Sequence, residues 1–329
     1  MERIVFMGTP EFAVPSLRAL AERYEVTLVV TQPDRPAGRS RALRAPAVKA
    51  AAQALGLPVY QPESLRGPEA LARLQQVAPT AIVVAAYGEI LRRNVLALPP
   101  RGCVNVHASL LPRHRGAGPI AAAILAGDAV AGVTIMLMDE GMDTGAMLAQ
   151  AEVPIDPDDT TGTLTARLAE LGAQLLAETL PRWLAGEIEP QPQDGAQATY
   201  AARITKQDGL IDWAEPAEII VRQVRAFDPW PGAYSYWQGR RLRVTRAEAV
   251  LAWCGREVPG TVLEMAAGPA VATGEGALLL HEGVSLGVVA GGIAVIACAA
   301  FTVRSRSRDS SVRRSPMSRL TVRRLRIVS

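Results

Sequence analysis

The stretch Gly102-Cys103-Val104-Asn105-Val106-His107 decides the fold class. It is short and rich in valine, which is typical of a buried strand. Runs of the same kind, separated by alanine- and leucine-rich segments of helical length such as 46–55 and 68–76, occur at residues 4–7, 27–30, 81–86 and 133–137. This alternation predicts βαβ units, and therefore an α/β fold with a mostly parallel sheet that helices cover on both faces.

The first domain is expected to close with a long helix. Thr160 or Thr161 can cap its start, and Pro181 is expected to end or bend it. Between these positions, apolar residues follow helical spacing at Leu164, Leu168, Leu171 and Leu175.

A change of composition marks the boundary of a second domain. Residues 186–198 are rich in Glu, Pro, Gln, Asp and Gly, and Pro190 and Pro192 favour an extended connection. One short helix near residues 219–227 is followed by strand-like runs at 233–237, 242–247 and 260–263. We expect a catalytic domain over residues 1–188, a linker over 189–207, and a small β-barrel over 208–282.

The composition is that of an ordinary globular protein, with 49% apolar and 20% charged residues in a chain of 329. The cysteines Cys103, Cys254 and Cys298 are too few and too far apart for a disulfide framework or a thiolate zinc site. The first residues enter an apolar run directly, without the features of a signal peptide. We therefore expect a cytoplasmic protein.

Asn105 and His107 are expected on the same side of their strand, because side chains alternate along a strand. The strand gives way there to the irregular segment 108–112, and parallel sheets bind ligands at the carboxyl ends of their strands. An amide and an imidazole held side by side can donate hydrogen bonds to one developing oxyanion. The alternative interpretation is a satisfied polar pair at the edge of a sheet.

The segment Asp139-Glu140-Gly141-Met142-Asp143-Thr144-Gly145 follows another predicted strand, so its carboxylates are also expected at a carboxyl end. A carboxylate that meets His107 would raise the pKa of the imidazole and make an imidazolium available. The alternative is a glycine-flanked turn without chemistry.

Five positive charges lie within 15 residues in and beyond the proline- and glycine-rich loop 31–41, at Arg35, Arg39, Arg41, Arg44 and Lys49. Arginines on a loop suit a nucleic-acid backbone. A cluster of charges is also what a solvated surface contains, and the residues alone leave both interpretations open.

Taken together, these motifs resemble the folate-dependent formyltransferases. The resemblance rests on Asn105-Val106-His107, Ser109-Leu110-Leu111-Pro112, Arg115-Gly116 and Asp143-Thr144-Gly145. Further similarity to the members that act on charged initiator tRNA lies at residues 6–13, 31–39, 84–88 and 225–231. The resemblance covers most of residues 1–282, and it implies a Rossmann-like formyltransferase domain followed by a small OB-like β-barrel.

The resemblance also implies an activity, which is transfer of a formyl group from 10-formyltetrahydrofolate to the amino group of methionine on initiator tRNA. This reaction passes through a tetrahedral intermediate, needs no metal and supports translation initiation. The family's catalytic residues fall on Asn105, His107 and Asp143. Its folate-binding residues fall on Ser109, Leu110, Leu111, Pro112, Tyr87 and Gly88, and its tRNA contacts on Arg35, Arg39, Arg41, Arg44 and Lys49. We expect a cytoplasmic monomer that binds neither DNA nor a membrane.

Two alternatives belong to different functional classes. One is a formyltransferase that acts on an amino sugar nucleotide or on glycinamide ribonucleotide. The loop 31–41 with the arginines in and just beyond it, which we call the arginine loop, and the second domain argue against this alternative. The other is a protein that binds folate or RNA without catalysis. Loss of activity with retained folate binding in His107→Ala would separate an enzyme from such a binder.

The resemblance stops near Glu282, where the composition changes. Residues 283–303 carry no charge, and nine arginines with one aspartate follow, so residues 1–282 carry a net charge of −5 although the whole chain carries +3. The apolar stretch is long enough to span a membrane, but its four glycines and five alanines make a weak anchor. We favour a frame change in the coding sequence, which resequencing tests, over a divergent natural tail or a membrane segment. A frame change would leave the barrel incomplete.

Overall fold

The computed structural model describes residues 2–37, 42–237, 239–285 and 325–326. Arg39 and Arg41, two of the predicted tRNA contacts, lie outside the described residues, as does most of the tail predicted over 283–329. The chain divides into two compact units, Met1–Arg203 and Ile204–Ser329.

A seven-stranded sheet forms the centre of the first unit, in the order β10-β9-β7-β6-β1-β2-β5. The pairs that join β5, β2, β1, β6 and β7 are all parallel, whereas β9 runs antiparallel to β7 and β10 antiparallel to β9. The prediction of an α/β domain with a mostly parallel sheet is therefore confirmed. The strands span β1 Arg3–Gly8, β2 Glu25–Val30, β5 Val59–Tyr60, β6 Ala81–Ala85, β7 Cys103–His107, β9 Val130–Leu137 and β10 Met147–Pro154.

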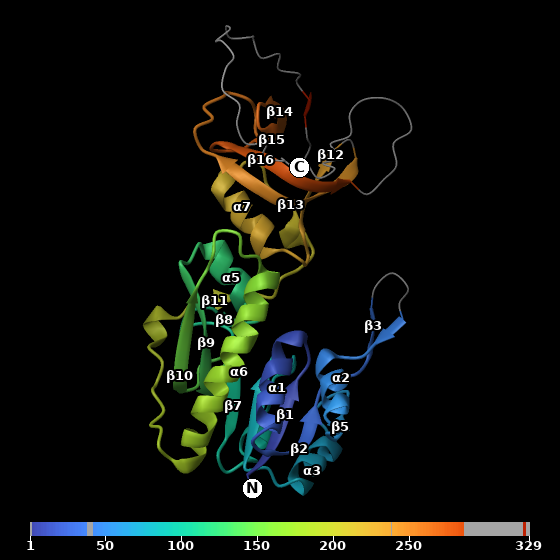
Figure 1. Cartoon of the computed structure of the whole chain (residues 1–329), viewed down its shortest axis with the longest axis vertical. Coiled ribbons are helices and arrows are strands. Elements are labelled where there is room, and N and C mark those ends of the chain that lie inside the picture. The colour runs from blue at the N-terminus through green and yellow to red at the C-terminus, as the bar shows by residue number, and fades with distance from the viewer. Residues whose placement is uncertain (1, 38–41, 238, 286–324, 327–329) are drawn as a thin grey trace, which may run out of the picture. The chain divides into compact units, whose positions relative to one another are not determined.

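Helices pack against both faces of this sheet. Val5 and Met7 share a buried cluster with Leu74 of α3 and Val95 of α4, and alternation turns Ile4 and Phe6 to the opposite face. Figure 1 shows α1 and α6 side by side, and the two helices contact each other. The helices span α1 Val14–Ala21, α2 Ala47–Ala54, α3 Pro68–Gln76, α4 Arg93–Leu96, α5 Pro119–Ala126 and α6 Thr161–Ala185.

Short elements complete the first unit. The strands β3 (Arg35–Ala37) and β4 (Ala42–Arg44) form a hairpin, and β8 (Arg115–Gly116) pairs in parallel with β11 (Tyr200–Ala201). Turns of 3₁₀ helix lie at Glu11–Ala13 and Gly195–Gln197, and another at Gln207–Gly209 belongs to the second unit.

The long helix α6 begins as predicted but does not end at Pro181. The Thr160 hydroxyl accepts a hydrogen bond from the Thr163 backbone N–H, and the Thr163 hydroxyl accepts one from the Thr160 N–H. Because proline has no N–H, the Ala177 carbonyl four residues earlier loses its helical partner. An Arg23 guanidinium N–H donates to that carbonyl over 2.9 Å instead, and the helix continues to Ala185.

The close approach of α6 to the sheet places the strand β7. A Cβ on Gly172 would lie 2.9 Å from a methyl carbon of Val106, closer than two carbon atoms pack. Glycine is therefore required where the helix crosses β7. The buried face of α6 contains Leu164, Leu168 and, one position later than the predicted Leu175, Leu176.

The second unit contains one antiparallel sheet in the order β12-β13-β16-β15-β14-β17 and the helix α7 (Ala217–Ala226). Ile220 and Val224 of α7 pack against Val244 of β13 and Leu278 of β16. The strands span β12 Ala233–Trp237, β13 Arg240–Val250, β14 Thr261–Met265, β15 Gly268–Ala272, β16 Ala277–Ser285 and β17 Leu325–Arg326. The predicted small β-rich second domain is confirmed as a half-barrel of antiparallel strands.

None of the helices among the described residues is both long and apolar enough to cross a membrane.

Candidate functional site

Asn105 and His107 lie at the end of β7, and both side chains are buried, with 8% and 6% of their surface exposed. Alternation turns both away from the side on which Val106 meets α6. Within residues 2–37, 42–237 and 239–285, no protein group forms a hydrogen bond with the Asn105 side-chain amide. A buried amide without a protein partner is suited to a hydrogen bond with a ligand.

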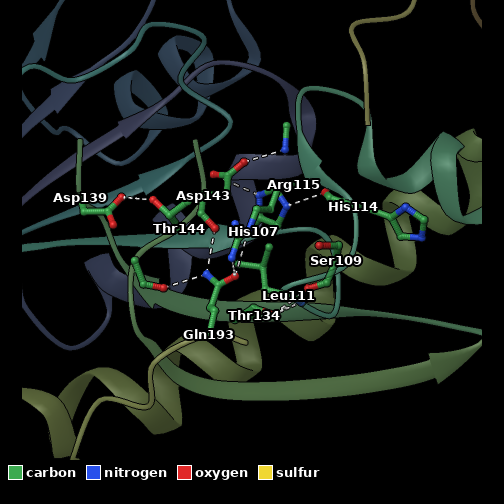
Figure 2. A network of polar contacts seen from close by, with 12 residues as sticks. His107, Ser109, Leu111, His114, Arg115, Thr134, Asp139, Asp143, Thr144 and Gln193 are labelled. Carbon is green, nitrogen blue, oxygen red and sulfur yellow. Dashed lines mark hydrogen bonds and ion pairs between the residues drawn. The ribbon is translucent and has the colours of Figure 1, made fainter. Parts of the chain in front are cut away.

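Both ring nitrogens of His107 face oxygen acceptors (Figure 2). The Nε2–H donates to the backbone carbonyl of His114 over 3.2 Å, and Nδ1 lies 3.7 Å from Oδ1 of Asp143. The His114 ring points away from this network and pairs through Nε2 with Asp128 over 2.7 Å. His107 is therefore held between a carbonyl and a carboxylate that approach from separate loops.

Burial lowers the pKa of His107 below its ordinary value of 6.5, and the nearby Asp143 carboxylate and His114 carbonyl raise it in part. The positive charge that His114 can carry acts in the lowering direction. The Asp143 carboxylate thus acts in the predicted, raising direction, but loss of hydration outweighs its attraction and the pKa of His107 is lowered.

Asp143 lies beside His107 because of the turn that follows β9, and the order of the strands in the sequence did not predict this arrangement. Because β9 runs antiparallel to β7, its carboxyl end at Leu137 pairs with Val104, at the opposite end of β7 from His107. Segment 139–145 therefore follows the carboxyl end of its strand as predicted, but this end lies at the other edge of the sheet from His107. The turn nevertheless brings Asp143, at φ +51°, against His107, and its Oδ2 accepts the backbone N–H of Gly116 over 2.8 Å.

Internal hydrogen bonds also stabilise this turn. Asp139 Oδ1 accepts the Thr144 hydroxyl over 2.7 Å and the Gly141 N–H over 3.0 Å. The glycine at position 116 is required at the point of contact, since a Cβ there would lie 2.5 Å from the Ala201 carbonyl oxygen. The Asp143 carboxylate thus has a fixed backbone donor at a place where the chain cannot carry a side chain.

Two residues that the sequence did not indicate hold the Ser109–Pro112 segment. The Thr134 hydroxyl donates to the Ser109 carbonyl over 2.7 Å and accepts the Leu111 N–H over 3.1 Å. The Gln150 amide donates to the Leu111 carbonyl over 2.8 Å and to the Thr134 hydroxyl over 2.9 Å. Both residues lie on neighbouring strands with nothing in their local sequence to distinguish them.

The segment also lines a cavity of about 170 Å³, in which Ser109 and Leu110 face His114 and Asp128. Small-molecule sites commonly enclose about 300–1,000 Å³. This cavity is therefore smaller than a typical site for a whole small molecule.

Tyr87, one of the residues that the resemblance assigns to folate, packs into the core with only 2% of its surface exposed. Its hydroxyl has no hydrogen-bond partner among the described residues, and burial raises its pKa above the ordinary value of 10. The Thr9 hydroxyl donates to its backbone carbonyl over 2.7 Å. Gly88 follows at φ +93°, a conformation that favours glycine.

The arginine loop contains the β3–β4 hairpin, in which Arg35 lies opposite Arg44 in the strand register. Lys49 lies on α2, where its ammonium contacts both carboxylate oxygens of Asp34 at 2.7 and 2.9 Å. Hydrogen bonds from Gln61 and Lys49 lower the pKa of Asp34. Lys49 therefore anchors the base of the loop, and its charge is already paired.

In the second unit, the arginines of β13 are engaged with neighbouring groups. The Arg241 guanidinium stacks on the Tyr234 ring at 3.7 Å, and Arg243 pairs with Asp228 over 3.3 Å. Stacked and paired arginines can still present the remaining N–H groups to a phosphate.

Across the described parts of the chain, no three His, Cys, Asp or Glu side chains gather as a metal centre requires. The assembled groups are an unpartnered amide, an imidazole and a carboxylate at one buried place beside a parallel sheet. Such a set can polarise a carbonyl and move a proton, which defines the class of α/β group-transfer enzymes.

Comparison with known proteins narrows this class. Residues 2–180 match the family described as "Formyl transferase", and residues 203–286 match "Formyl transferase, C-terminal domain". Methionyl-tRNA formyltransferase from Roseiflexus sp. is 55% identical over 280 residues, which cover 84% of this chain and 86% of the relative. The corresponding protein from Chloroflexus aurantiacus is 54% identical over 283 residues, or 85% and 91% of the two chains. The chain belongs to the methionyl-tRNA formyltransferase family.

Solved structures share the fold at low sequence identity. An N-formyltransferase from Helicobacter canadensis, determined with folinic acid and dTDP-3-aminofucose, aligns with a TM-score of 0.65 at 18% identity, over 86% of this chain and all of that one. Methionyl-tRNA formyltransferase from Clostridium thermocellum aligns with a TM-score of 0.54 at 16% identity, over 77% and 96% of the two chains. These likenesses support the fold.

Proposed function

We propose that this protein transfers the formyl group of 10-formyltetrahydrofolate to the amino group of methionine on charged initiator tRNA. The proposal is carried by Asn105 and His107, which lie buried on one strand, and by Asp143, which approaches His107 from a separate turn, in a chain of this family. The enzyme acts as a monomer in the cytoplasm and binds neither DNA nor a membrane.

The reaction needs an oxyanion to be stabilised and a proton to be moved. The unprotonated methionine nitrogen attacks the formyl carbon, and the carbonyl electrons move to the formyl oxygen. The Asn105 amide donates a hydrogen bond to that oxygen, and the protonated ring of His107 stabilises its charge. The bond from carbon to the folate nitrogen then breaks, and the proton lost by the amine reaches that nitrogen.

Asp143 makes the protonated form of His107 less costly. Its carboxylate lies 3.7 Å from Nδ1, close enough for strong attraction to an imidazolium and far enough to admit adjustment during the reaction. A water molecule between the carboxylate and the reacting groups can relay the proton. Asp143 is thus assigned to charging and orienting His107.

The folate is proposed to lie along Ser109, Leu110, Leu111 and Pro112, with Tyr87 and Gly88 contributing backbone groups. Thr134 and Gln150 fix the shape of the Ser109–Pro112 segment through hydrogen bonds to Leu111. Ser109 donates its own hydroxyl to the Arg113 carbonyl over 2.7 Å, so this serine stabilises the loop.

The arginine loop is proposed to hold the tRNA through Arg35, Arg39, Arg41 and Arg44, with Lys49 anchoring it through Asp34. Arg44→Ala should raise the KM for tRNA several-fold and reduce by about one the slope of log KM against log salt, because one phosphate contact is lost. The kcat at saturating tRNA should remain unchanged. Steady-state kinetics between about 50 and 200 mM salt measure both.

Arg66→Ala is the matched control, since Arg66 is an exposed arginine of the same unit that belongs to neither proposed site. An unchanged salt slope in Arg44→Ala would contradict the assignment of this loop to tRNA.

The function itself is tested by formyl transfer to charged initiator methionyl-tRNA, with uncharged tRNA as control. An amino sugar nucleotide and glycinamide ribonucleotide are offered as alternative acceptors, because proteins of the same fold with other acceptors exist. Transfer to the charged tRNA alone is expected. Transfer to a small acceptor alone would overturn the proposed substrate.

The tail offers a separate prediction. The match to the family model ends at residue 286, which is one residue after the end of strand β16 at Ser285. We propose that a frame change has replaced the family's last barrel strands with the residues that follow position 286. Replacing residues 287–329 with the C-terminal segment of the Roseiflexus relative should lower the KM for tRNA and leave the KM for folate unchanged. An unchanged KM for tRNA, or an intact reading frame in independent isolates, would contradict this hypothesis.

A further inference from the structure

The side-chain amide of Gln193 connects two parts of the site. Its Nε2 donates to the Asp143 carbonyl and to the Gly145 carbonyl, both over 2.8 Å. Its Oε1 accepts from Nε and Nη2 of Arg115 over 3.1 and 2.7 Å. Both amide hydrogens and both lone pairs of the oxygen are therefore used.

Arg115 determines which way this amide points. Its guanidinium can only donate hydrogen bonds, so the oxygen of Gln193 must face it and the NH₂ group must face the turn. Arg115 is buried, with 5% of its surface exposed, and no carboxylate pairs with it among the described residues. Its backbone N–H donates to the Thr199 carbonyl over 2.8 Å, which fixes it to the segment that follows Gln193.

The two carbonyls that Gln193 holds directly follow the strained torsion of the turn. Asp143 adopts φ +51°, a conformation that non-glycine residues rarely adopt. Gln193 bonds to the carbonyl of this residue and to that of Gly145 two positions later, so it fixes the backbone that leaves the strained residue. Figure 2 shows Gln193 below Asp143, with its side chain directed toward the turn.

We propose that Gln193 is a positioning residue, which holds the Asp143 turn so that the carboxylate faces His107. It touches no reacting group and acts through Asp143 alone. The expected effect of Gln193 on kcat rests on the proposed function, whereas its effect on the His107–Asp143 geometry is independent of that function. The segment after α6 thus supplies part of the catalytic site, although its composition is that of a linker.

Titration of the His107 imidazole by NMR tests this geometry, because the chain has only three histidines to resolve. The groups that face His107 are the Asp143 carboxylate and the His114 carbonyl. The other ionisable groups nearby are Arg115 and the His114 ring, which points away from His107. Gln193→Ala should lower the pKa of His107 by about 0.5 as Asp143 withdraws, in the direction that Asp143→Asn lowers it. It should also reduce kcat about tenfold, with the KM values within about twofold.

Gln191→Ala is the matched control, since Gln191 lies in the same segment and its side chain bonds only the exposed Glu189 carbonyl. It should leave both readouts at their original values. In an Asp143→Asn background, Gln193→Ala should add no further change to the pKa of His107. A pKa unchanged by Gln193→Ala, or an equal change in both backgrounds, would overturn the proposal.

Gln193→Met serves if Gln193→Ala does not fold. Methionine retains the length without adding a charge and cannot donate to the two carbonyls, so Asp143 should withdraw and the pKa of His107 should fall. A pKa equal to that of the unaltered protein would again count against positioning. Because titration needs no substrate, a protein that fails to transfer formyl groups can still show the Gln193 effect.

Discussion

His107→Ala should lower kcat for formyl transfer by about a thousandfold and leave the Kd for folate within about twofold. His107 is assigned two functions, to stabilise an oxyanion and to move a proton. Loss of either function commonly lowers kcat by about 10²–10³-fold. The side chain is buried and lies on β7, so the folate segment at Ser109–Pro112, held by Thr134 and Gln150, keeps its own supports. Single-turnover transfer and folate titration measure the two effects.

His281→Ala is the control for loss of an imidazole. His281 lies in the second unit and pairs with Glu248 over 3.1 Å, and this substitution should leave kcat unchanged. A protein that only binds folate or RNA has no turnover to lose. Equal transfer by the unaltered protein and His107→Ala would therefore remove His107 from the reaction.

The strands and helices that local sequence specifies were predicted well. The runs at residues 4–7, 81–86 and 104–107 became β1, β6 and β7, because valine and isoleucine favour buried strands. The helix over 68–76 and the strand over 233–237 have the predicted bounds. Each of these signals lies within the element itself.

Features decided by tertiary contacts were missed or wrong. The direction of β9 depends on how its connection crosses the sheet, and an apolar strand reads the same in both directions. The continuation of α6 past Pro181 depends on Arg23, which lies 154 residues from Ala177. Local sequence contains neither piece of information.

The same limit applies to the candidate site. Asn105 and His107 could be paired from alternation on one strand, because both lie within a single element. The bonds that support them join residues far apart in the sequence, with 78 positions between Arg115 and Gln193 and 50 between Asp143 and Gln193. Gln193 lies in a stretch whose composition predicts only a connection.

The second large effect is expected from Asp143→Asn, which should reduce kcat at pH 7.5 by about a hundredfold. Burial already lowers the pKa of His107, and the Asp143 carboxylate acts in the raising direction. Removing its charge therefore lowers this pKa further. The fraction of imidazolium at any pH above the pKa then falls by about tenfold for each unit of the change.

The pH dependence distinguishes this mechanism from a structural role. If transfer needs the protonated ring, the high-pH limb of kcat moves to lower pH in Asp143→Asn, and the defect is smaller near pH 5.5 than at pH 7.5. Asp158→Asn removes an exposed carboxylate from the same unit and should leave the profile unchanged. A defect of equal size at every pH would mean that Asp143 holds a substrate or a water molecule instead of charging His107, since only the electrostatic role couples the loss to protonation of the ring.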